Sequence, residues 1–183
     1  MKKKKIYLIL GIFIFTGLAV LLGYKINCFF KYMYPPYNSS STLESKKKGL
    51  LINYFSVQPD FFSLPNGDTI KISEIWAEKK FKYLNECSDD IEISQSIDDY
   101  HLIISLNITR DSLKTICYLW DVVKISEPEY SSGGLYSNNN LGNEMLVKNS
   151  TVFNSIDTLK LVLYKDLKEV LFAKKFVIKS VGT

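Results

Sequence analysis

The sequence predicts a mainly β protein, with a single N-terminal transmembrane helix followed by an antiparallel β-sandwich or barrel-like domain. Three observations lead to this fold class. An uncharged apolar stretch near the N-terminus has the length of a membrane span, short β-rich runs separated by turn residues follow residue 50, and none of these runs has a convincing helical period. The predicted parts are a cytoplasmic basic tail over 1–5, the helix with an interfacial extension over 6–34, a juxtamembrane linker over 35–49 and an extracytoplasmic β domain over 50–183.

The membrane helix is predicted from residues 6–23, which are 18 residues without a charge. As a helix they span roughly 27 Å, close to the ~30 Å hydrocarbon core of a bilayer. Aromatic residues between 24 and 37 form a belt of the kind found at membrane interfaces. Pro35 and Pro36 end the helix, because neither can donate a backbone hydrogen bond.

Two other interpretations fit the same segment. A cleaved signal peptide also starts with cations and an apolar stretch, but small residues are missing at a cleavage site here. Lipoprotein processing at Cys28 would need small residues before that cysteine, where Lys25, Ile26 and Asn27 stand. We therefore expect an uncleaved anchor.

The orientation is predicted from the four lysines at positions 2–5, which abut one end of the apolar stretch. The positive-inside rule puts this end in the cytoplasm and the domain outside. The expected location is the cytoplasmic (inner) membrane, with the C-terminal domain in the periplasm if the host has two membranes. A composition of 22 Lys to one Arg is typical of an AT-rich genome and indicates a bacterium.

The net charge of +4 comes from the lysines that flank the apolar stretch. Residues 32–183 carry 17 Lys+Arg against 19 Asp+Glu, a net charge of −2. The domain therefore lacks the basic surface that nucleic-acid binding requires, and no nucleic-acid partner is expected.

The clearest predicted strand is 100–109, whose side chains alternate with a period of two. This alternation puts His101 on the polar face, as a solvated residue. Residues 75–84 are ambiguous, since 79–84 could continue the strand 69–76 after a bulge, or 75–84 could form a short helix. The other predicted strands are 50–57, 69–76 (with Ile70, Ile72 and Trp76 in the core), 115–125 and a hairpin of 158–165 with 169–179.

The segment most suggestive of function is 126–143, about 18 residues of turn-forming composition between two strands. A loop this long is usually functional or disordered, and the sequence does not choose between the two. If functional, it offers aromatic and amide groups to a protein or a glycan. The residues expected to bind a partner are Tyr130, Tyr136, Asn138, Asn139 and Asn140.

Cys87 and Cys117 could form a disulfide if the domain is exported, closing a loop of ~30 residues. The alternative is two buried free thiols. Cys28 lies at the membrane interface and is expected to stay apart from the domain.

No catalytic or metal site is predicted. His101 is the only histidine and stands in no nucleophile motif. An acidic cluster could hold calcium, but its spacing follows no known loop pattern, so solvated carboxylates are favoured. No cofactor is expected. The cluster consists of Asp89, Asp90, Glu92, Asp98 and Asp99.

The expected function is therefore that of a non-enzymatic envelope protein whose β domain binds a protein partner, as an accessory subunit or an immunity-type inhibitor. One alternative is an envelope glycan-binding module or small hydrolase. Another is a structural domain that spaces or oligomerises.

Overall fold

The fold is taken from a computed structural model, which describes residues 2–33, 38–85, 87, 89–96, 100–109, 118–136, 144–149, 155–165 and 169–182. The chain divides into two compact units. The first comprises Met1–Pro36 and Phe81–Ile93, and the second comprises Tyr37–Lys80 and Ser94–Thr183. In covalent terms, a short piece of the first unit is therefore inserted into the second.

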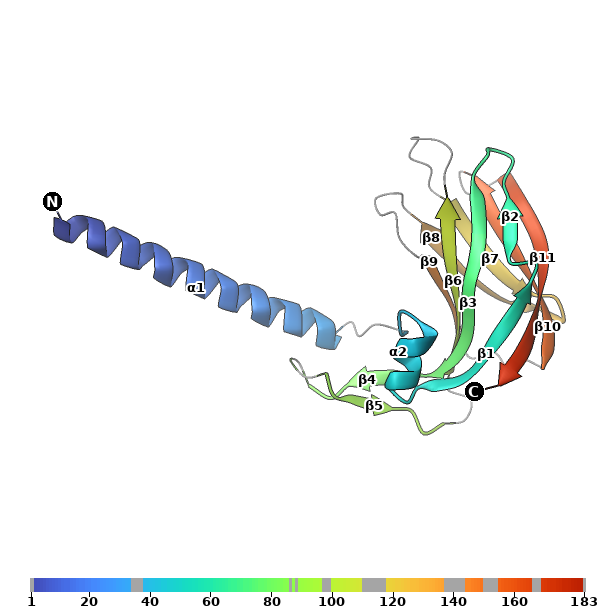
Figure 1. The fold of residues 1–183 in the computed structure, drawn as a ribbon, viewed down its shortest axis with the longest axis horizontal. Helices are drawn as coiled ribbons and strands as arrows, with labels where there is room; N and C mark the ends of the chain where they lie inside the picture. Colours follow the sequence, from blue (N-terminus) through green and yellow to red (C-terminus); the bar gives the residue numbers. More distant parts are fainter. Residues whose placement is uncertain are drawn as a thin grey trace. The chain divides into compact units, whose positions relative to one another are not determined.

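The first unit consists mainly of helix α1 (Lys2–Met33) (Figure 1). Its window Gly11–Phe30 has a mean hydropathy of 1.8 and is only 6% buried. At 20 residues this window is about 30 Å long, enough to cross a bilayer. The prediction of one N-terminal apolar helix is confirmed, and a signal sequence would share this length and composition.

A two-stranded hairpin completes the first unit. β4 (Phe81–Tyr83) pairs antiparallel with β5 (Ile91–Ile93) and forms a sheet of its own. Residues 75–84, ambiguous in sequence, are therefore neither a helix nor one continuous strand. Strand β3 ends at Lys79, and β4 begins at Phe81 in the separate sheet.

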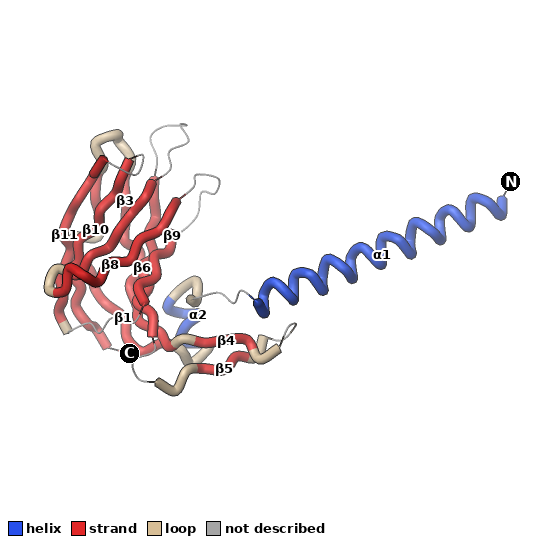
Figure 2. Tube along the Cα trace, turned by 180° about the vertical axis from the view of Figure 1, so that it is seen from behind, coloured by secondary structure: helices blue, strands red, loops and turns tan. Residues whose placement is uncertain are grey.

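The second unit is built on a nine-stranded antiparallel sheet (Figures 1 and 2). The order is β8-β7-β10-β11-β1-β3-β6-β9, and β2 pairs with β3 beside this path. The end strands β8 and β9 also contact each other. The strands are β1 (Leu51–Gln58), β2 (Phe61–Ser63), β3 (Thr69–Lys79), β6 (Tyr100–Thr109), β7 (Tyr118–Lys124), β8 (Glu127–Tyr136), β9 (Glu144–Asn149), β10 (Ile156–Lys165) and β11 (Glu169–Gly182).

Most of the predicted strands are confirmed, because they have strong local patterns. β6 has the predicted bounds, and the C-terminal hairpin of β10 and β11 pairs in the predicted way. An Asn66-Gly67 turn follows β2, with Gly67 at a φ of 89°, a conformation that glycine adopts without a Cβ clash.

The main core lies on one face of the sheet and consists of alternating apolar side chains. Phe62 from β2 packs edge-to-face on Phe172 and Phe176 of β11, with ring centroids 5.6 and 6.5 Å apart. Complete burial of each large side chain stabilises the fold by about 1.5–3 kcal/mol. The core also includes Phe55, Leu64, Ile70, Ile72, Ile75, Ala77, Leu102, Ile104, Leu106, Val122, Leu159, Leu161, Leu163 and Ile178.

A β-bulge in β3 changes which of its side chains face this core. Ile72 pairs with Leu106 and Glu74 with Ser105, so one extra residue stands between them. An extra residue moves every later side chain to the opposite face. Trp76, predicted to share a face with Ile72, is buried but lies on the other side of the sheet, outside the main core cluster.

That second face is covered by residues 38–50, which we call the arm. Predicted as part of a flexible linker, the arm instead contains helix α2 (Thr42–Lys47) and contacts β1 and β3. The prediction that His101 is solvated is wrong, because the residue is only 5% exposed.

The predicted long loop is also corrected. Ten of its residues form β8, which pairs with β7 from Lys124↔Glu127 to Tyr118↔Tyr136. Hydrogen bonding between strand backbones needs no apolar side chains. A Ser- and Gly-rich strand such as β8 therefore shows no apolar alternation in its sequence.

Candidate functional site

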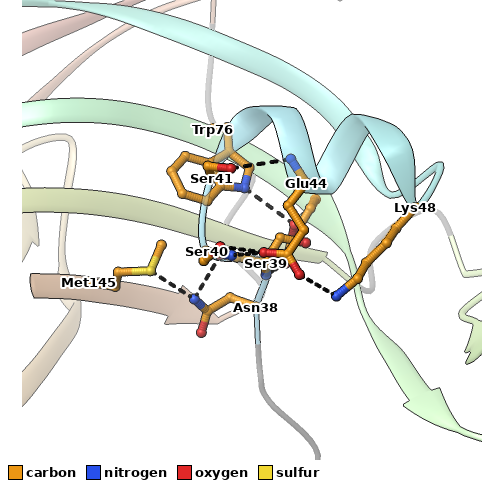
Figure 3. Close-up of polar contacts among 9 residues, drawn as sticks. Asn38, Ser39, Ser40, Ser41, Glu44, Lys48, Trp76 and Met145 are labelled. Atoms are coloured by element: carbon orange, nitrogen blue, oxygen red, sulfur yellow. Dashed lines mark hydrogen bonds and ion pairs between the residues drawn. The ribbon is translucent and has the colours of Figure 1, made fainter. Parts of the chain in front are cut away.

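The arm contains helix α2, which is too short to be stable alone and is stabilised by capping at both ends. Ser41 is the N-cap, and its Oγ accepts a hydrogen bond of 3.2 Å from the backbone N–H of Glu44. The Glu44 carboxylate in turn accepts hydrogen bonds from the N–H (2.7 Å) and the hydroxyl of Ser40. Figure 3 shows Ser41 and Lys48 both reaching Glu44. This is close to a capping box, a Ser-x-x-Glu signal that could have predicted the helix from the sequence.

Helix α2 ends at the C-cap residue Lys48, which a glycine follows. Gly49 has a φ of 69°, and its N–H donates to the carbonyl of Lys46 at 3.1 Å. The N–H of Leu50 donates to the carbonyl of Ser45 at 2.9 Å. These two bonds form a Schellman motif, which turns the chain directly into β1.

The carboxylate of Glu44 has a displaced pKa. Hydrogen bonding to the Lys48 ammonium 2.7 Å away, followed by the hydrogen bonds from Ser40, lowers the pKa of Glu44 to about 2 from 4.5. The carboxylate therefore stays ionised over the whole physiological range.

Two glutamates of β3 bind the arm to the sheet. Glu78, fully buried, accepts hydrogen bonds from the N–H of Ser39 (2.7 Å) and from Nε1 of Trp76 (3.3 Å). Glu74 accepts from the N–H and the hydroxyl of Thr42, at 3.0 and 2.6 Å. The bulge described above makes this possible, since it turns Glu78 toward the arm.

A third polar contact ties the arm to β9. The side-chain amide of Asn38 donates to the sulfur of Met145 at 3.3 Å (Figure 3). Thioether sulfur is a weak acceptor, so this contact positions the arm more than it stabilises it.

Other polar side chains of this face and of the arm are also buried. His101 stands opposite Glu78 in the β3–β6 ladder and is 5% exposed. Ser39 and Ser45 are fully buried, and their hydroxyls have no hydrogen-bond partner among the described residues. The hydrogen bonds of Glu78 and Glu74 therefore hold the arm in place on the sheet.

A buried charge pair lies between β7 and β10. Nζ of Lys124 is 3.3 Å from Oδ2 of Asp157, and the two side chains are 1% and 5% exposed. The other carboxylate oxygen of Asp157 accepts from the N–H of Thr158 at 3.0 Å. Charges this deeply buried persist because they are paired, and this pair fixes β7 against β10.

In the first unit, a disulfide joins Cys28 of α1 to Cys87 in the connection between β4 and β5. Their Cα atoms are 4.8 Å apart, and 59 positions separate them in sequence. The predicted partner of Cys87 was Cys117, which lies outside the described residues. That prediction is wrong, because Cys87 is bonded to Cys28. A lipid thioether would use the same sulfur of Cys28, so this bridge and lipoprotein processing are alternatives.

The acidic cluster does not assemble as one group in the described part of the chain. Glu92 pairs with Lys82 across the hairpin at 2.8 Å, and Asp89 and Asp90 lie in the connection before it. Asp98 and Asp99 lie outside the described residues. Among the residues that are described, no group of three or more His, Cys, Asp or Glu is arranged to hold a metal ion.

The predicted partner-binding residues belong to β8 and the segment after it. Tyr130 and Tyr136 are on β8, and their side chains are not described. Asn138, Asn139 and Asn140 lie outside the described residues.

Together these features define a class of protein by its fold: a mainly β, antiparallel domain that follows an N-terminal apolar helix long enough to span a membrane. No protein-family model matches the sequence, and neither a curated protein nor a solved structure matches it.

Proposed function

We propose that this chain is a single-pass bacterial envelope protein whose β domain lies outside the cytoplasm and binds a protein partner. The observation that carries the location is the Cys28–Cys87 disulfide, which lies near the C-terminal end of the apolar helix. Disulfides persist in oxidising compartments and are rare in the cytosol. The lysines at the opposite end of the helix favour the same orientation.

The arm supports an anchored role for the domain. Seven residues, 31–37, connect the apolar window of α1 to the start of the arm. The arm itself is held on the sheet by Glu74, Glu78 and the caps of α2. A domain bound so closely behind an anchor has little freedom to diffuse away, which suits a subunit that meets its partner at the membrane.

The proposed contact surface is β8 with residues 137–143. β8 pairs with β7 and stands at one end of the sheet order. Tyrosine and asparagine side chains are common in protein contact surfaces, and this segment carries both. We further propose that the sheet is barrel-like, because β8 and β9 at its two ends contact each other.

The location is tested by protease treatment of intact spheroplasts that express the full chain. We expect the β domain to be degraded in intact spheroplasts, with a cytoplasmic marker protein protected in the same sample. Survival of the domain until the membrane is lysed would contradict an extracytoplasmic location.

Partner binding is tested by photo-cross-linking in the native host, with benzoylphenylalanine placed at Tyr130 or Tyr136. Val177, 40% exposed on β11, provides a matched control position away from β8. We expect one discrete heterologous adduct from the β8 positions and none from Val177. An adduct between two copies of the chain would favour the oligomerisation alternative instead, and no adduct at all would argue against partner binding by β8.

A further inference from the structure

The β4–β5 hairpin has one apolar face and one polar face. Phe81 pairs with Ile93 and Tyr83 with Ile91, which puts four apolar side chains on the same side. The opposite side carries the ion pair of Lys82 and Glu92, whose side chains are 68% and 56% exposed. The four apolar side chains are only half-buried, although the rings of Phe81 and Tyr83 pack edge-to-face 6.0 Å apart.

A hairpin of three residue pairs has too small an interface to be stable by itself in water. Its apolar side chains retain exposed surface, and Leu84, directly after β4, is 54% exposed. This amphipathic hairpin therefore gains stability from an apolar environment on one side and water on the other.

The disulfide fixes the level of the hairpin along α1. Cys28 lies five residues after Gly23, where the uncharged stretch ends, which is about 7.5 Å along the helix axis. The Cα of Cys87 is 4.8 Å from that of Cys28. If α1 crosses a membrane, Cys87 therefore lies at the level of the interfacial layer, which is roughly 5–8 Å thick.

Aromatic side chains are present on both segments that this bridge joins. On α1, Tyr24, Phe29 and Phe30 are each about half-exposed, and the rings of the two phenylalanines pack edge-to-face. On the hairpin, Phe81 and Tyr83 belong to the apolar face. Aromatic side chains concentrate at the boundary between hydrocarbon and water, because their rings are apolar and polarisable and tolerate the headgroup layer.

We propose that the apolar face of the β4–β5 hairpin lies in the phospholipid headgroup layer of the membrane that α1 spans, as a second membrane contact beside the helix. The Lys82–Glu92 face remains in water. This inference rests on the proposed membrane anchor, and it does not depend on the partner-binding role of the β domain.

The test is photo-cross-linking of the full chain, reconstituted in vesicles of phosphatidylethanolamine and phosphatidylglycerol that carry an alkyne tag. Benzoylphenylalanine is placed at Tyr83 on the apolar face, at Lys82 on the polar face of the same strand, or at Phe15 in the middle of α1. A mobility shift on reduction shows that the Cys28–Cys87 bridge is intact in each variant. We expect lipid adducts at Phe15 and Tyr83, with a several-fold lower yield at Lys82.

Equal lipid yields at Tyr83 and Lys82, or a Tyr83 adduct within the chain itself, would overturn the inference while Phe15 still reports an anchored helix. Absence of lipid adducts at Phe15 would refute the anchor, and the hairpin contact with it. The two failures are therefore distinguished by which position loses its adduct.

Discussion

Replacing Cys28 with serine should strongly lower the stability of the chain, because it opens a loop of 59 residues. The chain-entropy relation for such a loop gives about 4 kcal/mol at 25 °C. The closed loop contains α2 and β1 to β4, so its opening gives most of the first half of the chain new freedom in the unfolded state.

The corresponding change in melting temperature can be estimated from the size of the second unit. With about 2.1 cal/mol/K of unfolding entropy per residue over about 130 residues, a loss of ~4 kcal/mol lowers the midpoint by about 15 °C. The assay is thermal unfolding of the detergent-solubilised chain, followed by circular dichroism, with and without a reducing agent.

The chain supplies its own matched control for this experiment. Cys117→Ser removes the cysteine that the sequence pattern paired with Cys87, and it should leave the midpoint nearly unchanged. Cys87→Ser should match Cys28→Ser, and the double variant should be no less stable than either single one. The reasoning fails if Cys117→Ser lowers the midpoint as much as Cys28→Ser, or if Cys28→Ser behaves like the unaltered chain.

Three further substitutions test the polar contacts. Glu44→Gln should lower the free energy of unfolding by about 1 kcal/mol at neutral pH, after allowance for the partial exposure of the ion pair with Lys48. The folded pKa of Glu44 is about 2 against 4.5, so this contribution is complete above pH 4.5 and is lost as the pH falls toward 2. The urea unfolding curves of the variant and the unaltered chain should therefore converge in acid. Asp157→Asn should cost about 3 kcal/mol in urea unfolding, because Lys124 loses its buried carboxylate partner, and most of this should return when Lys124→Met is added; no recovery would contradict the ion-pair explanation. Glu78→Gln should cost about 1–2 kcal/mol, because an amide replaces a carboxylate between two N–H donors, and should speed proteolysis of the arm more than Glu74→Gln does; equal effects would remove the special role of Glu78.

The membrane helix and most strands could be predicted because their signals are local. The length of the apolar helix can be read from 18 consecutive uncharged residues, and the period of two in β6 is visible within ten residues. β8 could not be predicted for the converse reason, since its Ser- and Gly-rich composition has no apolar period and its strand exists through pairing with β7.

The arm carries a local signal for its helix but none for its position. Ser41 and Glu44 stand at the spacing of a capping box, and Gly49 follows the C-cap residue Lys48. Its attachment to the sheet has no such signal, because Glu78 faces the arm only after the bulge beyond Ile72 reverses the faces of β3.

By itself, the sequence determined that an apolar helix precedes a domain of antiparallel strands, and that the positive charge belongs to the helix flanks and not to the domain. Only the tertiary structure decided that Cys87 pairs with Cys28, that His101 is buried, and that the predicted linker is part of the fold. The physical reason is the range of the interactions. Helix and strand periods depend on neighbouring residues, whereas disulfide partners, bulge positions and burial depend on which distant segments the fold brings into contact.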